Sequence, residues 1–214
     1  MSPSKSRRRR PRKKKSSNTK LILSAVAVLI IVVAAIVAYT MLGDNGSSSE
    51  VVPTSNTVLF ETSMGNITIQ LRDDMPITVN NFKKLVQDGV YDGTTFHRVV
   101  NLPNNLVIIQ GGNPGTGPWS GGAIPTIPDE FSDNSENNKN KRGTIAMANR
   151  GANTGSSQFF INGAYNSHLD NVHPVFGDII DGMDVVDDIL EVETAGDYNE
   201  PVEDVTLINA TIVD

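Results

Sequence analysis

Cysteine is absent from this chain of 214 residues, and histidine, with three copies, and tryptophan, with one, are scarce. Without cysteine the chain forms no disulfide, has no thiolate nucleophile and cannot hold zinc through sulfur. The three histidines lack the spacing of a metal-binding motif, and the carboxylates form no such motif either. We therefore expect neither a metal site nor a cofactor.

Positive charge is scarce after the first 20 residues. The chain has 18 Lys and Arg against 24 Asp and Glu, a formal net charge of −6. Ten of the 18 basic residues lie within residues 1–20, which hold no acid, so eight remain against 24 acids, a net of −16. Such a charge opposes self-association, and we expect a monomer.

One long hydrophobic run interrupts this pattern. Residues 21–42 begin at Leu21, end at Leu42 and contain no charged side chain. As a helix rising about 1.5 Å per residue, the run reaches roughly 33 Å, enough to cross a bilayer core of about 30 Å. The basic flank before it follows the positive-inside rule. We predict a single-pass signal anchor in the cytoplasmic membrane, with the N-terminus inside and the rest outside.

Other interpretations of this N-terminal region stay open. A cleaved secretory signal would end near Ala38, although the run is longer than the usual apolar region of about 7–15 residues. A soluble core helix is disfavoured because no polar face interrupts the run. The basic residues 7–15 are a pattern typical of nucleic-acid binding, but their position before the apolar run argues for anionic lipid headgroups and against nucleic acid.

The composition divides the chain into four parts. Residues 1–20 form a basic cytoplasmic tail, residues 21–42 the transmembrane anchor, and residues 43–57 a flexible linker rich in Gly, Ser and Asn. Residues 58–214 form one folded domain, in which alternating apolar positions indicate strands. The expected strands are 58–61, 67–71, 95–100, 106–110, 144–148, 158–161, 175–180 and 206–213.

Two segments of this domain have the apolar spacing of helices. Thr78 is expected to cap the first, which contains Phe82 and ends at Gly89, and the second runs from Met183 to Leu190. Many strands with two helices predict a mainly β fold, a closed barrel capped at its ends. The polar residues 132–142 are expected to be an exposed, mobile loop.

Three short segments in order carry the functional signal: Phe96–Arg98, Gln110–Gly112, and residues 147–149 followed by residues 157–160. With Val175-Phe176-Gly177 after them, they resemble the active-site segments of the cyclophilin-type peptidyl-prolyl cis/trans isomerases. The resemblance extends over residues 58–214. It implies a closed barrel of eight antiparallel strands capped by two helices, here preceded by one transmembrane helix. Its implied partners are proline-containing polypeptides.

The implied reaction needs no covalent chemistry. Rotation about a prolyl bond is slow because it breaks amide resonance, with a barrier of roughly 18–20 kcal/mol. In the twisted state the prolyl nitrogen accepts a hydrogen bond, so a fixed cationic donor stabilises that state over the planar one. Arg98 offers such a donor, since its guanidinium is always charged. The alternative is an ordinary surface arginine on a strand.

The resemblance assigns the remaining site residues. Gln110 is the second catalytic residue, which orients Arg98, and its alternative role is that of a strand-end glutamine before the Gly111-Gly112 turn. The positions expected to contact substrate are His97, Val107, Ile108, Asn149, Gln158, Phe160, Leu169 and His173. Neither His97 nor His173 receives an acid or base role, because the reaction transfers no proton.

Several residues depart from the family pattern. Val107 and Ile108 stand where Phe and Met are usual, and residues 101–105 lengthen the preceding loop, which predicts a reshaped pocket. His168 replaces a tryptophan that anchors cyclosporin, so we expect weak cyclosporin binding. Arg150 stands at a usually small position, which predicts a preference for acidic or polar residues upstream of the proline.

These observations favour an isomerase that assists the folding of exported or membrane proteins outside the cytoplasmic membrane. Residues 126–131 resemble prokaryotic members of the family more than cytosolic eukaryotic ones. The alternative is a binding or chaperone module that grips proline segments with little turnover. A structural envelope protein has only the anchor in its favour.

Overall fold

The computed structural model describes residues 55–103, 105–115 and 124–214. Within these ranges no helix is both long enough and apolar enough to cross a membrane. The predicted tail, the predicted span 21–42 and most of the predicted linker lie outside the described residues, so their assignments stay predictions.

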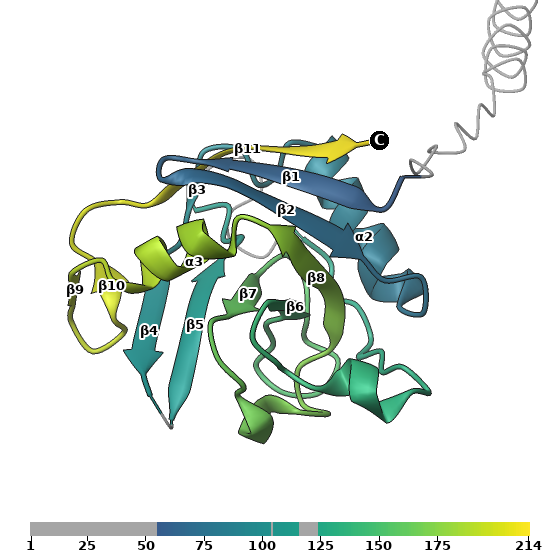
Figure 1. Ribbon diagram of the computed structural model, residues 1–214. Coiled ribbons are helices and arrows are strands. Elements are labelled where there is room, and N and C mark those ends of the chain that lie inside the picture. Colours follow the sequence, from purple (N-terminus) through teal and green to yellow (C-terminus); the bar gives the residue numbers. More distant parts are fainter. Residues whose placement is uncertain (1–54, 104, 116–123) are drawn as a thin grey trace, which may run out of the picture. The chain divides into compact units, whose positions relative to one another are not determined.

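One antiparallel sheet forms the scaffold of the domain (Figure 1). The order of its nine strands within the described residues is β3-β11-β1-β2-β8-β6-β7-β5-β4. Their bounds are β1 Thr57–Thr62, β2 Gly65–Leu71, β3 Thr94–Thr95, β4 Arg98–Leu102, β5 Leu106–Gly111, β6 Thr144–Met147, β7 Phe159–Asn162, β8 Val175–Asp181 and β11 Thr206–Val213.

The sheet is open, so the prediction of a closed eight-stranded barrel was wrong. Its edge strands β3 and β4 follow each other along the chain with only residues 96–97 between them, but they lie at opposite edges and do not pair. An irregular segment lies against this gap instead: the Phe96 amide donates to the Val205 carbonyl, and the Val99 amide to the Asn199 carbonyl, each at 2.9 Å. The same segment carries a separate two-stranded sheet of β9 (Thr194–Ala195) and β10 (Glu200–Pro201).

The predicted strands themselves are confirmed with shifts of at most two residues at their ends. The one clear change is the predicted strand 95–100, which divides into β3 and β4 on either side of residues 96–97. In β1 and β2 the buried positions alternate, which gives the two-residue period of a strand with one buried face. In β6 and β7 every residue is buried, and the signal is a short continuous apolar run instead.

Helix α2 (Pro76–Gln87) begins two residues before the predicted cap, Thr78. Pro76 occupies the first helical turn, where a missing amide proton costs nothing. The carboxylate of Glu130, more than 50 residues away, accepts from the amides of Ile77 at 3.0 Å and Thr78 at 2.8 Å. A negative charge at the positive end of the helix dipole replaces the expected local cap.

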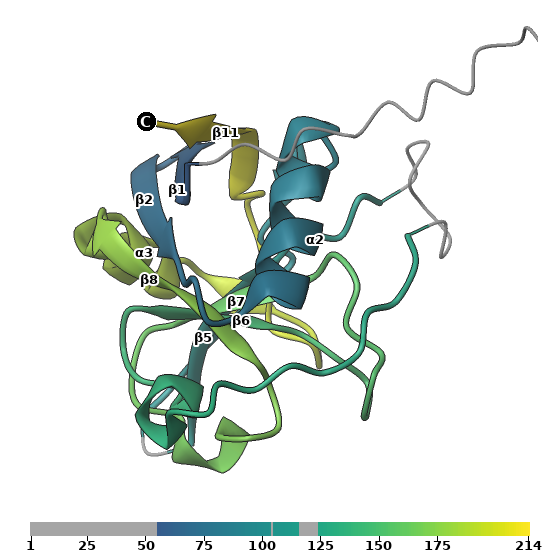
Figure 2. The ribbon, with the colours of Figure 1, turned by 90° about the vertical axis from the view of Figure 1, so that its right-hand side faces the viewer.

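The main core lies inside the curve of the sheet, and α2 and α3 (Met183–Leu190) lie on opposite sides of it (Figure 2). Phe82 of α2 packs against several rings from the strands, with centroid distances of 4.9 Å to Phe176 and 5.9 Å to Phe159. The core aromatic residues are Phe60, Phe82, Tyr91, Phe96, Phe159 and Phe176, all at most 1% exposed.

A second, smaller apolar cluster lies on the opposite face of the sheet. Its fully buried members come from β4 to β8: Val100, Ile108, Ala146, Phe160 and Val175. Because alternate residues of a strand face opposite sides, these side chains point away from the main core. The outer cluster, as we call it, is the floor on which the candidate site is built.

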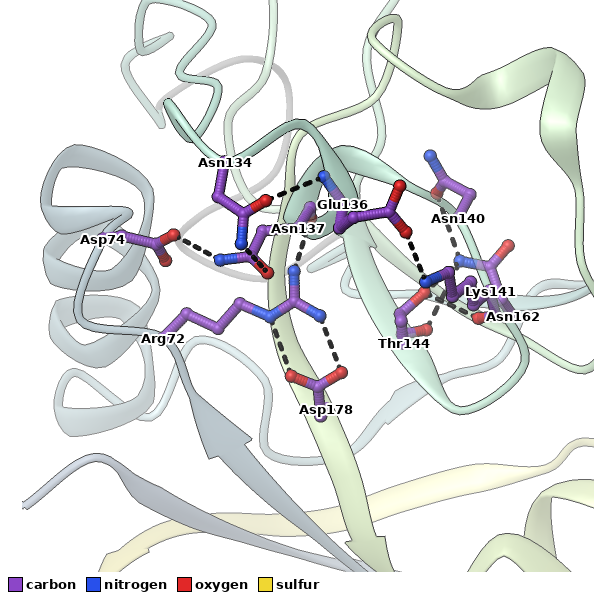
Figure 3. A network of polar contacts seen from close by, with 10 residues as sticks. All are labelled: Arg72, Asp74, Asn134, Glu136, Asn137, Asn140, Lys141, Thr144, Asn162 and Asp178. Atoms are coloured by element: carbon purple, nitrogen blue, oxygen red, sulfur yellow. Dashed lines mark hydrogen bonds and ion pairs between the residues drawn. The ribbon is translucent and has the colours of Figure 1, made fainter.

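Residues 132–142 were expected to be an exposed, mobile loop, and the prediction of exposure was wrong at three positions. Ser132, Asn138 and Asn140 are each at most 8% exposed. The guanidinium of Arg72 forms a bidentate ion pair with Asp178 at 2.7 Å and donates to the Asn137 carbonyl, which fixes the loop to β2 and β8 (Figure 3). The short helix η1 (Ser135–Asn138) lies within this loop.

Candidate active site

Arg98 and Gln110 are directly opposite each other on β4 and β5. Arg98 Nη1 lies 3.4 Å from Gln110 Oε1, to which it donates. Gln110 in turn donates from Nε2 to Gln158 Oε1 at 3.1 Å. The two predicted catalytic residues are therefore brought together, and the relay of amides leaves other guanidinium N–H groups of Arg98 available, since an arginine offers five.

An apolar floor lies beside this pair. Phe160 on β7 is directly opposite Gln110 on β5, and Ile108 lies two residues along the same face of β5. Leu169, the last residue of the short helix η2 (Ser167–Leu169), packs against the same outer cluster. Three predicted substrate contacts thus line one water-poor surface next to the Arg98 donor.

His173 forms the edge of that floor. Its ring meets the Phe160 ring edge to face, with centroids 5.3 Å apart, and its Nδ1 lies 3.1 Å from the Met147 carbonyl oxygen. Burial lowers the pKa of His173 below its ordinary value of 6.5, although the Met147 hydrogen bond acts in the opposite direction. The neutral ring at pH 7 donates from Nδ1 to that carbonyl and serves as a wall.

One predicted contact, Val107, is placed elsewhere, and another, His97, lies next to Arg98 between β3 and β4. Val107 faces the main core, where it is 8% exposed, because it is an odd number of residues from Gln110 along β5. The structure therefore does not bring Val107 to the face that carries Arg98. Burial lowers the pKa of His97, while a backbone hydrogen bond with Thr95 and, more weakly, the carboxylate of Glu200 raise it.

A cavity of about 720 Å³ continues from Gln110 away from the apolar floor. Asn149 and Gln158, both predicted contacts, line it together with Arg150. The Asn149 side chain donates to the Val172 carbonyl at 2.9 Å and accepts from the Gly151 amide at 3.3 Å, so it holds its own turn in place. The other lining residues are Asn113, Pro114, Ile124, Thr126, Ala148, Thr154, Ser156 and Ser157.

The extra residues lie at the far end of the hairpin formed by β4 and β5. Asn101 pairs with Val107, and Leu102 pairs with Leu106, so the ladder from Arg98 continues without a register shift. The Asn105 amide closes the turn on the Leu102 carbonyl at 3.0 Å. The expectation that this insertion reshapes the pocket receives no support from the pairing.

Sequence reasoning missed the buried asparagines behind the floor. Asn162 donates to Asn140 Oδ1 at 3.1 Å and to Thr144 Oγ1 at 2.9 Å (Figure 3). Asn140 donates to the carbonyl of Leu169 at 3.0 Å, and Asn166 donates to Asn162 Oδ1 at 2.7 Å. The network ties β6 and β7 to η2, and its one signal in the sequence is a polar residue ending the apolar run 159–161.

The arrangement suits a non-covalent reaction. It combines a fixed cation, amide groups that orient it and an apolar surface, and it holds no nucleophile paired with a base. Among the described residues, no group of three His, Asp or Glu side chains is placed to bind a metal ion.

Comparison with known proteins gives the family. The profile of the family described as "Cyclophilin type peptidyl-prolyl cis-trans isomerase/CLD" matches residues 57–212. "Peptidyl-prolyl cis-trans isomerase-like 1" of Gibberella zeae is 39% identical over 164 residues, covering 75% of this chain and 96% of that protein. "Peptidyl-prolyl cis-trans isomerase" of Synechococcus elongatus is 50% identical over 121 residues, 56% of this chain and 77% of that protein.

Other relatives are longer, and the chain spans 26% of "Peptidyl-prolyl cis-trans isomerase-like 2" of Gibberella zeae. Among solved structures, a cyclophilin-type isomerase of Cryptosporidium parvum has a TM-score of 0.65 at 26% identity, with 75% of this chain and 98% of that chain covered. That enzyme was also crystallised in the presence of the dipeptide Ala-Pro. With its Arg98–Gln110 pair and its outer apolar floor, this chain belongs to the cyclophilin-type peptidyl-prolyl cis-trans isomerases.

Proposed function

We propose that the Arg98 guanidinium accelerates prolyl isomerisation by donating to the prolyl nitrogen in the twisted state. The observation that supports this proposal is the chain of hydrogen bonds from Arg98 through Gln110 to Gln158, which lies beside the outer cluster. Gln110 holds the guanidinium against the sheet, so little reorganisation accompanies the reaction. Phe160 and Leu169 hold the proline ring through apolar contact, which leaves the acyl side free to turn.

The dipeptide Ala-Pro in a related crystal supports proline-containing chains as substrates. His168 lies exposed on η2 beside Leu169. A small polar ring there offers less apolar surface than an indole, which supports weak cyclosporin binding. The relative from Synechococcus elongatus supports the prokaryotic-like character of the domain.

The test of activity uses residues 43–214, since a relative that consists almost wholly of this domain indicates that it stands alone. The cis-to-trans rate of an Ala-Pro test peptide is measured with the wild type and with Arg98→Ala. We expect clear acceleration that the variant loses. A folded wild type that binds the peptide without accelerating isomerisation would instead identify a proline-binding chaperone module.

We further propose that the domain acts outside the cytoplasmic membrane on exported or membrane proteins, as a monomer tethered by residues 21–42. The support is the uncharged run with its basic flank, and tethering raises the local concentration of enzyme near emerging chains. Because the chain has no cysteine, single cysteines report topology cleanly. A membrane-impermeant thiol reagent should label Ser47→Cys in intact cells and leave Ser16→Cys unlabelled, and the reverse pattern would refute the orientation.

A further inference from the structure

Arg150 lies on the wall of the cavity that continues from the catalytic pair. Its backbone is fixed, because the Arg150 amide donates to Thr154 Oγ1 at 2.8 Å and Thr154 Oγ1 donates to the Gly151 carbonyl at 2.7 Å. Its side chain is exposed, and within the described residues no ion pair or side-chain hydrogen bond engages the guanidinium. A positioned turn thus presents an unneutralised cation to the cavity.

The other cations of the domain behave differently. Arg72, Lys84, Lys139, Lys141 and Arg142 each form an ion pair with Asp or Glu. Lys83 is buried and donates to Asn56 Oδ1 at 2.9 Å. That leaves Arg98, whose side chain contacts Gln110, and Arg150. Of the eight cations after residue 20, all of them among the described residues, two lack a carboxylate or buried partner. Arg150 lines the cavity, and Arg98 contacts Gln110, which lines it as well.

The acids closest to this part of the groove along the chain are already occupied. Asp129, three residues after the lining residue Thr126, accepts from the Asn153 amide at 3.0 Å. Glu130 caps α2 through the amides of Ile77 and Thr78. Asp129 keeps its negative charge while it accepts from Asn153, and acids further away are screened beyond about 8 Å at physiological salt. Among the described residues that line the cavity, Arg150 is the one charged side chain, so it is the group to which a ligand carboxylate would bind.

We propose that this cavity selects substrates with an acidic residue shortly before the proline, bound through a carboxylate–guanidinium contact to Arg150. This inference rests on the proposed isomerase function, which it deepens by naming a substrate class. The acidic residue is placed on the N-terminal side of the proline because the resemblance implies that the usually small position held by Arg150 faces residues upstream of the proline. Guanidinium and carboxylate match in bidentate geometry, which favours Asp or Glu over a neutral amide.

The expected size of the charge preference is small because the Arg150 side chain is exposed to solvent. An ion pair in solvent changes an equilibrium constant by about fivefold or less. We therefore expect kcat/KM for a peptide with Glu before the proline to exceed that for Gln by roughly three- to fivefold at low salt, and Lys to fall below Gln by a similar factor. The preference should shrink as salt is raised.

The experiment compares peptides that carry Glu, Gln or Lys at each of the two positions before the proline, plus one set with the charge after it. Enzymes are the wild type, Arg150→Gln, Arg150→Glu and, as a matched control outside the groove, Arg142→Gln, each checked by melting. Arg150→Gln should give equal rates for Glu and Lys peptides, Arg150→Glu should reverse the order, and Arg142→Gln should keep it.

The neutral Gln peptide distinguishes failure of the acidic preference from failure of the isomerase function. Acceleration of the Gln peptide with equal rates for Glu and Lys would overturn the acidic preference and leave the isomerase intact. A charge preference that survives in Arg150→Gln, or that is strongest with the charge after the proline, would also overturn it. No acceleration of any peptide would refute the isomerase function itself.

Discussion

Replacing Asn162 with alanine tests whether the buried asparagine network holds the floor of the site. Asn162 is fully buried, and its side chain makes three short hydrogen bonds, to Asn140, Thr144 and Asn166, at 3.1, 2.9 and 2.7 Å. Each contributes about 1 kcal/mol net, and an amide left without a partner costs about 1–3 kcal/mol. The Asn140 side-chain oxygen accepts from Asn162, so truncation leaves this buried oxygen without that donor.

The free energy of unfolding should therefore fall by about 4 kcal/mol: about 3 kcal/mol for the three hydrogen bonds and about 1 kcal/mol, the low end of the range, for the Asn140 oxygen left without a donor. At about 2–4 °C per kcal/mol for a domain of this size, Tm falls by roughly 8–16 °C. Urea unfolding of residues 43–214 measures it, with an unchanged m-value showing that the unfolded state is the same. Asn209→Ala is the control, since that half-exposed side chain bonds Glu61 and Thr211 at the surface and should cost about 0.5 kcal/mol or less. A loss below about 1 kcal/mol for Asn162→Ala would refute the reasoning.

Three further changes follow from the structure. Glu130→Ala removes the distant cap of α2 and should cost about 1–2 kcal/mol by urea unfolding, whereas an unchanged midpoint would show that the cap is dispensable. Gly112→Ala should destabilise strongly, because φ is +78° and a Cβ would lie 2.7 Å from the Ser157 carbonyl oxygen; a Tm within 2 °C of wild type, about 1 kcal/mol, would contradict this. Burial lowers the pKa of His97 and His173, so the unfolded state binds more protons and stability should fall as pH drops below about 6.5. Replacing both His97 and His173 with Gln should make the free energy of unfolding depend less on pH in this range. An unaltered pH dependence would show that other groups cause it.

The strands and the catalytic pair could be predicted because their signals are local. Alternation along β5 places Gln110 and Ile108 on one face, and the cross-strand register then places Arg98 beside them. The same alternation places Val107, three residues from Gln110, on the face that packs into the main core. The resemblance to the family assigned Val107 and Ile108 together as substrate contacts and did not distinguish the two faces. Whether two strand residues are an even or an odd number of positions apart predicts which face each occupies better than their closeness in sequence does.

The features that sequence reasoning missed depend on contacts between distant segments. Glu130 replaces Thr78 as the cap of α2 from across the chain, and no local pattern encodes such a pairing. At the open side of the sheet, Phe96 donates to the Val205 carbonyl, which is a contact between distant segments. Residues 132–142 look like a solvated loop from composition, yet Arg72 fixes them through a backbone carbonyl.

The most direct test of the account separates binding from turnover at Arg98. Peptide Kd and kcat/KM are measured for the wild type, Arg98→Lys and Arg98→Ala of residues 43–214. If Arg98 donates chiefly in the twisted state, Arg98→Ala lowers kcat/KM by about 100- to 1000-fold while Kd changes little, and Arg98→Lys recovers part of the loss. Equal losses in affinity and turnover would show that Arg98 binds the ground state as strongly, which would contradict its assignment as the catalytic donor.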